Sequence, residues 1–223
     1  MTRRGEIDTE ALVGALADCA APVNRLSSPH ARMAKWFMLS LMFAATVVVV
    51  MGLRPDIASK LGDTRFLIEV GAAVMTSMLA AGAAFCAGCP GRPIWERFAP
   101  LPAVAVWLGS LAYGCWESFI ARGTGALALR IDLMCLPYIL MVASVPMLLI
   151  LAMIRRGAPI APKSATMLAI LASTSLGAAA LRLFHTEDDC LMVLVWQFGS
   201  VALLASAGAL LGRSFLRWPQ EVR

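Results

Sequence analysis

Cysteine is the residue type whose spacing in this chain most directly suggests chemistry. Of the six cysteines, Cys86 and Cys89 form a CxxC motif, which elsewhere serves as a redox pair or as half of a zinc site. No second ligand pair accompanies this motif at zinc-site spacing, so we predict that it has a structural role. Cys19 and Cys115 have no cysteine companion that the sequence would suggest.

Cys135 and Cys190 stand close to the starts of two long hydrophobic runs, and we expect them at similar depth. Two such thiols could form a disulfide if their Cα atoms approach within about 7 Å, or could bind a soft metal ion as thiolates. His185 and the acidic run 187–189 could add ligands, although carboxylates nearby disfavour a thiolate. Each cysteine could equally be a small apolar packing residue. The residues alone leave these readings open.

Ionisable side chains are nearly absent from the hydrophobic runs, whereas pumps and transporters keep such groups inside the membrane to carry ions. Glu69 lies near one end of the second run, and we expect it to be an interfacial carboxylate that reaches water; Gln197, in the last run, is neutral. Metalloprotease, phosphate-loop and serine-elbow motifs are all missing. We therefore expect no enzymatic activity and no cofactor.

The elements that must position these residues are membrane-spanning helices. Apolar residues make up 60% of the chain and charged residues 15%, against about 25% charged in soluble domains. Continuous runs of about 20 residues, the length that crosses a bilayer as a helix, occupy 36–53, 66–89, 98–116, 133–154, 164–181 and 190–212. Unbroken runs favour helices over strands.

The predicted fold class is thus all-α, a polytopic six-helix transmembrane bundle preceded by a short N-terminal helix. We expect a tail over 1–34, the transmembrane domain over 35–213 and a second tail over 214–223. The first long hydrophobic run begins near Trp36, so no cleavable signal peptide is expected. An even number of crossings puts both termini on one side.

Charge predicts which side that is. Thirteen of the nineteen basic residues fall on the side of the N-terminus, namely Arg3, Arg4, Arg25, Arg32, Lys35, Arg92, Arg97, Arg155, Arg156, Lys163, Arg213, Arg217 and Arg223. The other six are Arg54, Lys60, Arg65, Arg122, Arg130 and Arg182. Because basic residues accumulate in cytoplasmic segments, we predict that both termini are cytoplasmic.

The N-terminal tail carries a helix pattern of its own. Asp8 can cap a helix with Glu10 in its first turn, and apolar side chains then recur at three- and four-residue spacings on one side, namely Leu12, Val13, Leu16 and Ala20. Ser28 followed by Pro29 predicts a second helix start that leads into the first crossing. The apolar face could bind a partner protein or lie on the inner leaflet.

Small residues at four-residue spacing predict close helix contacts within the bundle. Gly208 with Gly212, and Ser173 with Gly177, fit the pattern that lets helix backbones approach in lipid.

Several segments together resemble one protein family. They are the tail LVGALADCAAPVNRLSSPHARMAKW, the DLMCLP motif of the fourth run and the closing DDCLMVLVWQFGSVALLASAGALLGRSFLRW. In order and type they are similar to the NrsF-type membrane anti-sigma factors of proteobacteria. The closing segment is the most specific, because Cys190, Trp196 and the terminal Leu216, Arg217 and Trp218 follow the family's pattern. The middle runs match only in hydrophobicity and in a Pro-Gly after the second.

The resemblance implies a function that the amino-acid composition alone cannot indicate. Such a protein holds an extracytoplasmic-function sigma factor at the bacterial inner membrane through its tail, and releases it on periplasmic metal or oxidative stress. The tail residues that match the family's motif are Leu12, Val13, Leu16, Asp18, Pro22, Val23 and Arg25, and the paired sensor cysteines are Cys135 and Cys190. The partners implied are a sigma factor and the lipid bilayer, without direct nucleic-acid contact.

The chain departs from the family's pattern around its last predicted loop. HTEDDC stands where a Cys-Pro-rich opening is usual, and Gln197 follows Trp196 where His or Tyr is common. Two other classes remain as alternatives. One is a small transporter or channel, which needs a polar pathway, and the other is a membrane thiol oxidoreductase that uses Cys86 and Cys89.

Overall fold

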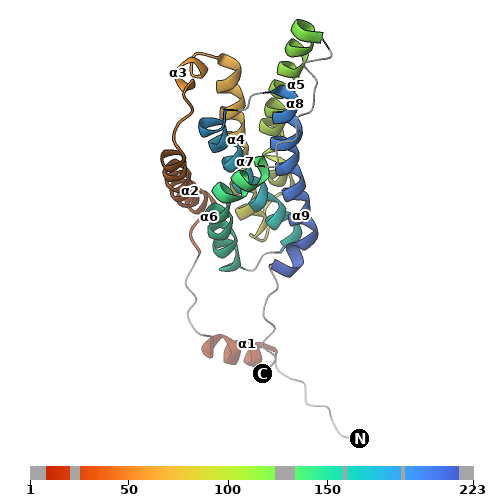
Figure 1. The fold of residues 1–223 in the computed structure, drawn as a ribbon. Helices are drawn as coiled ribbons and strands as arrows, with labels where there is room; N and C mark the ends of the chain where they lie inside the picture. The colour runs from red at the N-terminus through yellow and green to blue at the C-terminus, as the bar shows by residue number, and fades with distance from the viewer. Residues whose placement is uncertain (1–8, 21–25, 124–133, 158–159, 187–188, 216–223) are drawn as a thin grey trace, which may run out of the picture.

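The structure is a bundle of long helices with one separate short helix at its N-terminal side (Figure 1). It is a computed structural model that describes residues 9–20, 26–123, 134–157, 160–186 and 189–215. Within these ranges the chain is helical and contains no strand, which confirms the predicted all-α class. Six helices are long and apolar enough to cross a membrane.

The helices follow one another along the chain with short connections. In order they are α1 (Thr9–Asp18), α2 (Pro29–Met51), α3 (Ile57–Lys60), α4 (Thr64–Ala87), the 3₁₀ turn η1 (Ile94–Phe98), α5 (Leu101–Arg122), α6 (Cys135–Arg155), α7 (Pro162–Phe184), α8 (Cys190–Met192), the π-helical segment η3 (Val193–Phe198) and α9 (Gly199–Phe215). The last three form one continuous helix.

Helix ends follow local sequence signals. Ser28 caps α2, since its hydroxyl accepts a hydrogen bond from the Ala31 amide at 3.3 Å, and Pro29 occupies the first turn as predicted. The first spanning helix therefore begins seven residues before the hydrophobic run at Trp36. Gly52 and Gly123 end α2 and α5 with φ of 83° and 65°, a left-handed backbone that glycine adopts without strain.

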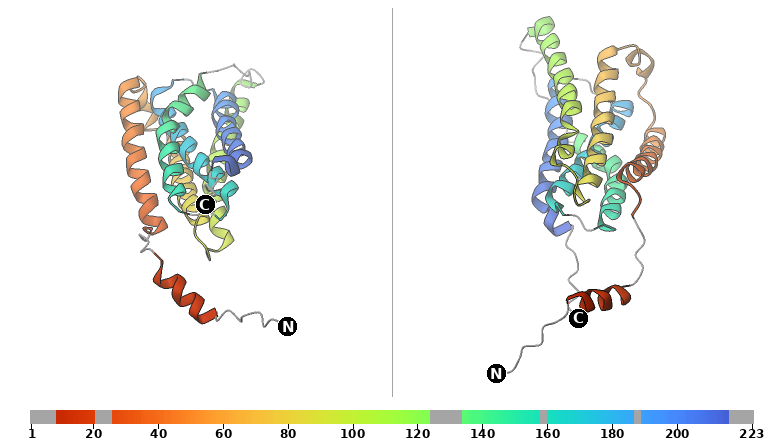
Figure 2. Two further views of the ribbon diagram at one scale, coloured as in Figure 1. Left: turned by 90° about the horizontal axis from the view of Figure 1, so that it is seen from below. Right: turned by 180° about the vertical axis from the view of Figure 1, so that it is seen from behind.

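Helix α7 lies at the centre of the bundle and packs against α4, α6 and α9 (Figures 1 and 2). Helix α2 packs on α6, α4 and α7, while α5 packs on α4 and on α8. We call the end where α2 begins at Pro29 and α6 ends at Arg155 the tail-proximal end. The opposite end, where α6 begins at Cys135, is the tail-distal end.

The interior is built from small side chains that allow close helix approach. A Cβ atom added to Gly177 would lie 2.8 Å from the Ile139 carbonyl oxygen of α6, and one added to Gly212 would lie 2.8 Å from the Lys163 Cα of α7. Gly177 thus lies at a close contact of α7 with α6, and both Gly208 and Gly212 lie at close contacts of α9 with α7. The Ser77 hydroxyl of α4 also donates to a carbonyl of α7, at 2.7 Å.

Candidate functional site

The tail helix α1 presents an apolar face that no part of the described chain covers. None of its residues is buried, and the exposed fractions of Leu12, Val13 and Leu16 are 48%, 60% and 63%. Spacings of three and four residues place these three side chains on one side of the helix. Asp18, the last residue of α1, is two positions beyond Leu16 and so points about 200° away around the axis.

Of the tail residues identified by resemblance, the structure therefore brings three onto one surface. Leu12, Val13 and Leu16 form what we call the tail face. Pro22, Val23 and Arg25 lie outside the described residues, as do the predicted cap Asp8 and the acidic residues Glu187 and Asp188.

The tail joins the bundle at a buried arginine. Arg32, in the first turns of α2, is 7% exposed, and its guanidinium donates to the Met153 carbonyl in the last turn of α6. The guanidinium carbon lies 4.6 Å from the centre of the Phe85 ring of α4, within cation–π range. One charged side chain thus connects the root of the tail to two other helices. Its place at a helix start and its basic type had suggested only a role in topology.

A second contact joins α2 to the middle of α6. The indole of Trp36, which is fully buried, donates to the Pro146 carbonyl oxygen at 2.8 Å. Pro146 lies inside α6, where a proline removes one intrahelical hydrogen bond and favours a kink. Helix α6 begins with Cys135 and ends beside Arg32. A single helix therefore runs from a candidate sensor cysteine to the base of the tail.

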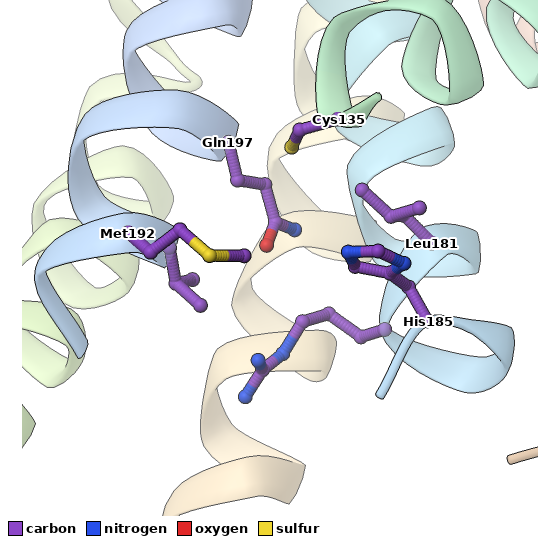
Figure 3. A pocket seen from close by; sticks show the side chains of 7 residues that line it. Cys135, Leu181, His185, Met192 and Gln197 are labelled. Atoms are coloured by element: carbon purple, nitrogen blue, oxygen red, sulfur yellow. The ribbon is translucent and has the colours of Figure 1, made fainter. Parts of the chain in front are cut away.

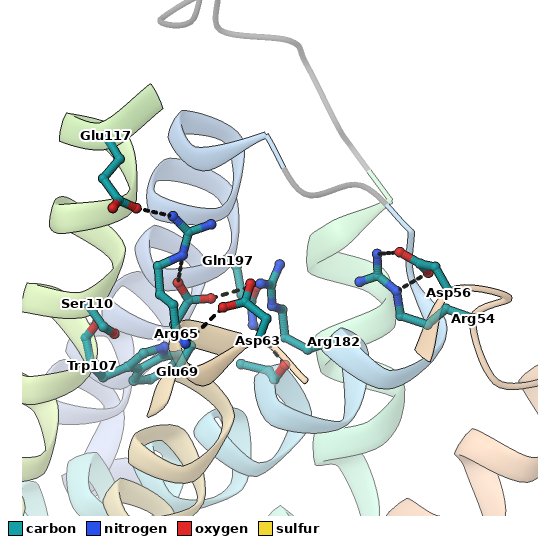
Figure 4. A network of polar contacts seen from close by, with 11 residues as sticks. Arg54, Asp56, Asp63, Arg65, Glu69, Trp107, Ser110, Glu117, Arg182 and Gln197 are labelled. Atoms are coloured by element: carbon teal, nitrogen blue, oxygen red, sulfur yellow. Dashed lines mark hydrogen bonds and ion pairs between the residues drawn. The ribbon is translucent and has the colours of Figure 1, made fainter. Parts of the chain in front are cut away.

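At the tail-distal end, the expectation for Glu69 is wrong. Its carboxylate is 5% exposed and does not reach water as an interfacial group would. It accepts a hydrogen bond from Arg182 Nη2 of α7 at 2.8 Å, and Arg65 Nε of its own helix lies 3.5 Å away (Figure 4). A carboxylate can be buried here because two guanidinium groups balance its charge.

The ion pairs extend from Glu69 to the rim of the bundle. Arg65 Nη1 donates to Glu117 Oε2 of α5 at 3.1 Å, and this outer pair is partly exposed (Figure 4). We call Arg65, Glu69, Glu117 and Arg182 the charged cluster; it joins α4, α5 and α7. The sequence held a signal for this cluster. Glu69 is near the start of the run 66–89 and Arg182 directly follows the run 164–181, and the predicted topology puts both positions on the same side of the membrane. Arg182 lies outside its run, however, and sequence reasoning therefore assigns it to a loop.

Gln197 completes the polar contacts below the cluster. Its side chain is 3% exposed, and its amide nitrogen donates to the Ala178 carbonyl of α7 at 2.8 Å. The residue belongs to η3, and π-helical segments within α-helices occur frequently at functional sites. A cavity of about 10 Å³ lies beside it, lined by Cys135, Leu181, Arg182, His185, Met192, Val193 and Gln197 (Figure 3).

The structure separates the environments of the two predicted sensor cysteines. Cys135 is 2% exposed, packs in an apolar cluster with Ile139 and Leu181, and lines the same small cavity as His185. Cys190, the first residue of α8, is partly exposed, and α8 packs against α5, which contains the buried Cys115.

The CxxC motif lies at the tail-proximal end of α4. Cys86 accepts a hydrogen bond from Arg92 Nη2 at 3.3 Å, and the Cys89 thiol donates to the Phe85 carbonyl at 3.5 Å. Arg92 also pairs with Glu96 at 3.0 Å. The structural role of the motif stays a prediction. Among the described residues no group of three or more His, Cys, Asp or Glu side chains is arranged to hold a metal ion.

The fold and these sites define a helical protein with six helices that could cross a membrane, an exposed apolar helix at one end and a polar, cysteine-bearing junction at the other. Comparison with known families matches residues 16–218 to NrsF, negative regulator of sigma F. The chain belongs to this family, as the resemblance of its segments predicted, and is a negative regulator of a sigma factor. No curated protein and no solved structure matches it significantly.

Proposed function

We propose that this protein is a membrane anti-sigma factor that sequesters an extracytoplasmic-function sigma factor through its tail and releases it on periplasmic metal or oxidative stress. It resides in the bacterial inner membrane with both termini in the cytoplasm, and it acts by binding rather than by catalysis. The observation that carries the proposal is the uncovered tail face in a member of a family that regulates a sigma factor.

The tail face is suited to bind a hydrophobic groove of a partner. Complete burial of Leu12, Val13 and Leu16 would contribute about 5 to 9 kcal/mol before ordering costs are subtracted. Because α1 is short and ordering a tail opposes binding, tight sequestration requires more of the tail, which is why Pro22, Val23 and Arg25 belong to the proposed interface. The partner supplies the apolar surface that covers the tail face.

Helix α6 supports a route from stimulus to tail. Cys135 begins this helix at the tail-distal end, and the Met153 carbonyl at its other end accepts from Arg32 at the tail root. A stimulus that changes the packing around Cys135 and Cys190 would shift α6 against α2, and Arg32 would carry that shift to α1. To act as a switch, the stimulus must favour one packing over the other by a few kcal/mol.

The proposal is tested with the full-length protein in detergent and its candidate sigma factor. Leu12→Asp with Leu16→Asp should weaken binding by about 3 kcal/mol or more, which is at least about a 100-fold rise in Kd. Ala11→Asp adds one charge on the opposite side of α1 and serves as the matched control. Equal affinity of the two variants in a titration would contradict the assigned interface.

The sensing step has its own test. Replacing Cys135 and Cys190 together with serine should leave sigma binding intact and abolish release under metal or oxidative stress. Release is measured as transcription from a sigma-dependent promoter in cells that carry the variant. A normal stress response in the double variant would remove these cysteines from the mechanism.

A further inference from the structure

A cavity of about 290 Å³ lies at the tail-proximal end of the bundle, between α2, α4 and η1. Its volume is close to the lower limit of the range for small-molecule pockets. Neither the tail face nor the charged cluster lines it. The cavity is therefore distinct from the sites described above, and it shares with the tail only the first turn of α2.

The inner wall of this cavity is apolar and comes from two helices that are apolar enough to cross a membrane. It is formed by Met33 of α2 and by Leu79, Gly82 and Ala83 of α4. A Cβ atom added to Gly82 would lie 3.2 Å from the Met33 Sδ, so the absence of a side chain at this position keeps the space between the helices open. A wall of this kind suits a hydrocarbon chain.

The mouth of the cavity is polar and holds a fixed cation. Arg92 Nη2 donates to the Cys86 thiol at 3.3 Å, and Arg92 Nε donates to Glu96 Oε2 at 3.0 Å. These contacts hold the guanidinium in place, and its further N–H groups remain for a phosphate. The exposed side chains of His30 and Trp95 line the same mouth, and Trp95 is 69% exposed. Indoles in membrane proteins favour the depth of the lipid headgroups.

We propose that this cavity binds one acyl chain of an anionic phospholipid, with the lipid phosphate on Arg92. The apolar wall accounts for the chain and the fixed guanidinium for the charge of the headgroup. The inference goes beyond the proposed function, because it requires a membrane but no sigma factor. Since Pro29 and His30 begin α2 and line the cavity, a bound lipid would lie directly against the root of the tail.

The test titrates the purified full-length protein, stripped of lipid in detergent, with phosphatidylglycerol or with phosphatidylcholine of the same acyl chains. Native mass spectrometry counts the bound lipids and gives their Kd values. We expect one phosphatidylglycerol to bind about fivefold more tightly than phosphatidylcholine, the effect of one basic residue on an anionic lipid. Equal Kd values for the two lipids would overturn the inference.

Two variants of the mouth should act in opposite directions. Arg92→Gln should remove the preference for phosphatidylglycerol, because it removes the cation that binds the phosphate. Glu96→Gln keeps an acceptor for Arg92 Nε but removes a negative charge, so it should increase the preference. A merely structural role of the two residues would make both variants weaken binding, and that result would contradict the assigned site.

A matched control and a competitor separate this site from two other sources of binding. Arg97→Gln removes a charge from the same 3₁₀ turn at a position that does not line the cavity, and should keep the preference. Its loss in this variant as well would indicate general attraction to a basic surface and would overturn the site. Glycerol phosphate carries the phosphate without the chains and should not displace phosphatidylglycerol. Displacement would indicate a soluble phosphate ester as the ligand and would rule out the lipid.

Discussion

At the scale of single residues, the buried pair of Glu69 and Arg182 is the feature that hydropathy least predicts. A window average registers one charge among many apolar residues and says nothing of its partner. The pair lies between α4 and α7, separated by 113 positions, at 2.8 Å. Burying one charge alone would cost several kcal/mol, so each side chain is kept in place by the other.

This mutual dependence gives a stability prediction. Glu69→Gln should lower the free energy of unfolding by about 3 to 5 kcal/mol, because it leaves a buried guanidinium without its charge partner. Unfolding is followed by circular dichroism in mixed micelles. The control Glu117→Gln alters the carboxylate of the outer pair with Arg65, in which the two side chains are 50% and 37% exposed, and should change stability by less than about 1 kcal/mol. Similar losses for the two variants would refute the importance of burial.

At the scale of elements, the sequence predicts the helices well and their neighbours poorly. Six hydrophobic runs correspond to six spanning helices, since length and apolarity decide whether a segment crosses lipid. Sequence signals missed the six residues by which α5 extends beyond its run at Trp116, and the π-helical segment η3. Which helices lie next to each other depends on tertiary packing, and the sequence of a single hydrophobic run does not indicate its neighbours.

Close approach of α6 and α7 at Gly177 yields a prediction at this scale. Gly177→Ala should destabilise the bundle by about 1 to 3 kcal/mol, because the new methyl group would meet the Ile139 backbone carbonyl at 2.8 Å. Gly109→Ala in α5 is the matched control, since nothing lies within 4 Å of its added Cβ. We expect that variant to be neutral or slightly more stable. Thermal unfolding in detergent compares the two.

The link between α2 and α6 can be tested in the same way. Arg32→Met removes the hydrogen bond to Met153 while keeping an apolar side chain against Phe85. On the proposed function, this variant should bind the sigma factor as the wild type does but release less of it under stress. Lys35→Met, an exposed change one turn further along α2, is the control. Unaltered release by Arg32→Met would show that the signal takes another path.

At the scale of the whole molecule, function depends on orientation as much as on contacts. The tail face and the cysteine-bearing junction lie at opposite ends of the bundle (Figure 2). The helices are long and apolar enough to cross a bilayer. On the proposed function, the two ends of the bundle then lie on different sides of the membrane, and a stimulus at the tail-distal end acts on a partner at the other. The family assignment implies that a sigma factor is the partner. On the proposed function, this partner binds the tail in the cytoplasm.

Orientation is therefore the prediction that tests the proposal as a whole. A reporter active only in the cytoplasm should be active when fused at Met1 and inactive when inserted after Gly123, at the tail-distal end of α5. A reporter active only in the periplasm should give the reverse pattern. The thirteen-to-six division of basic residues is the physical reason. Periplasmic activity of the Met1 fusion would rule out contact between the tail and a sigma factor.

The π-helical segment η3 has a consequence for which neighbour Cys190 meets. A π segment accommodates an extra residue within a helix, and each residue of an α-helix turns the chain by about 100°. Deleting one residue from Val193–Phe198 would restore regular winding and swing the start of the last helix by that amount, away from α5. The π-helical winding of this segment thus sets the direction in which the Cys190 side chain points, and the deletion of a single residue would change that direction.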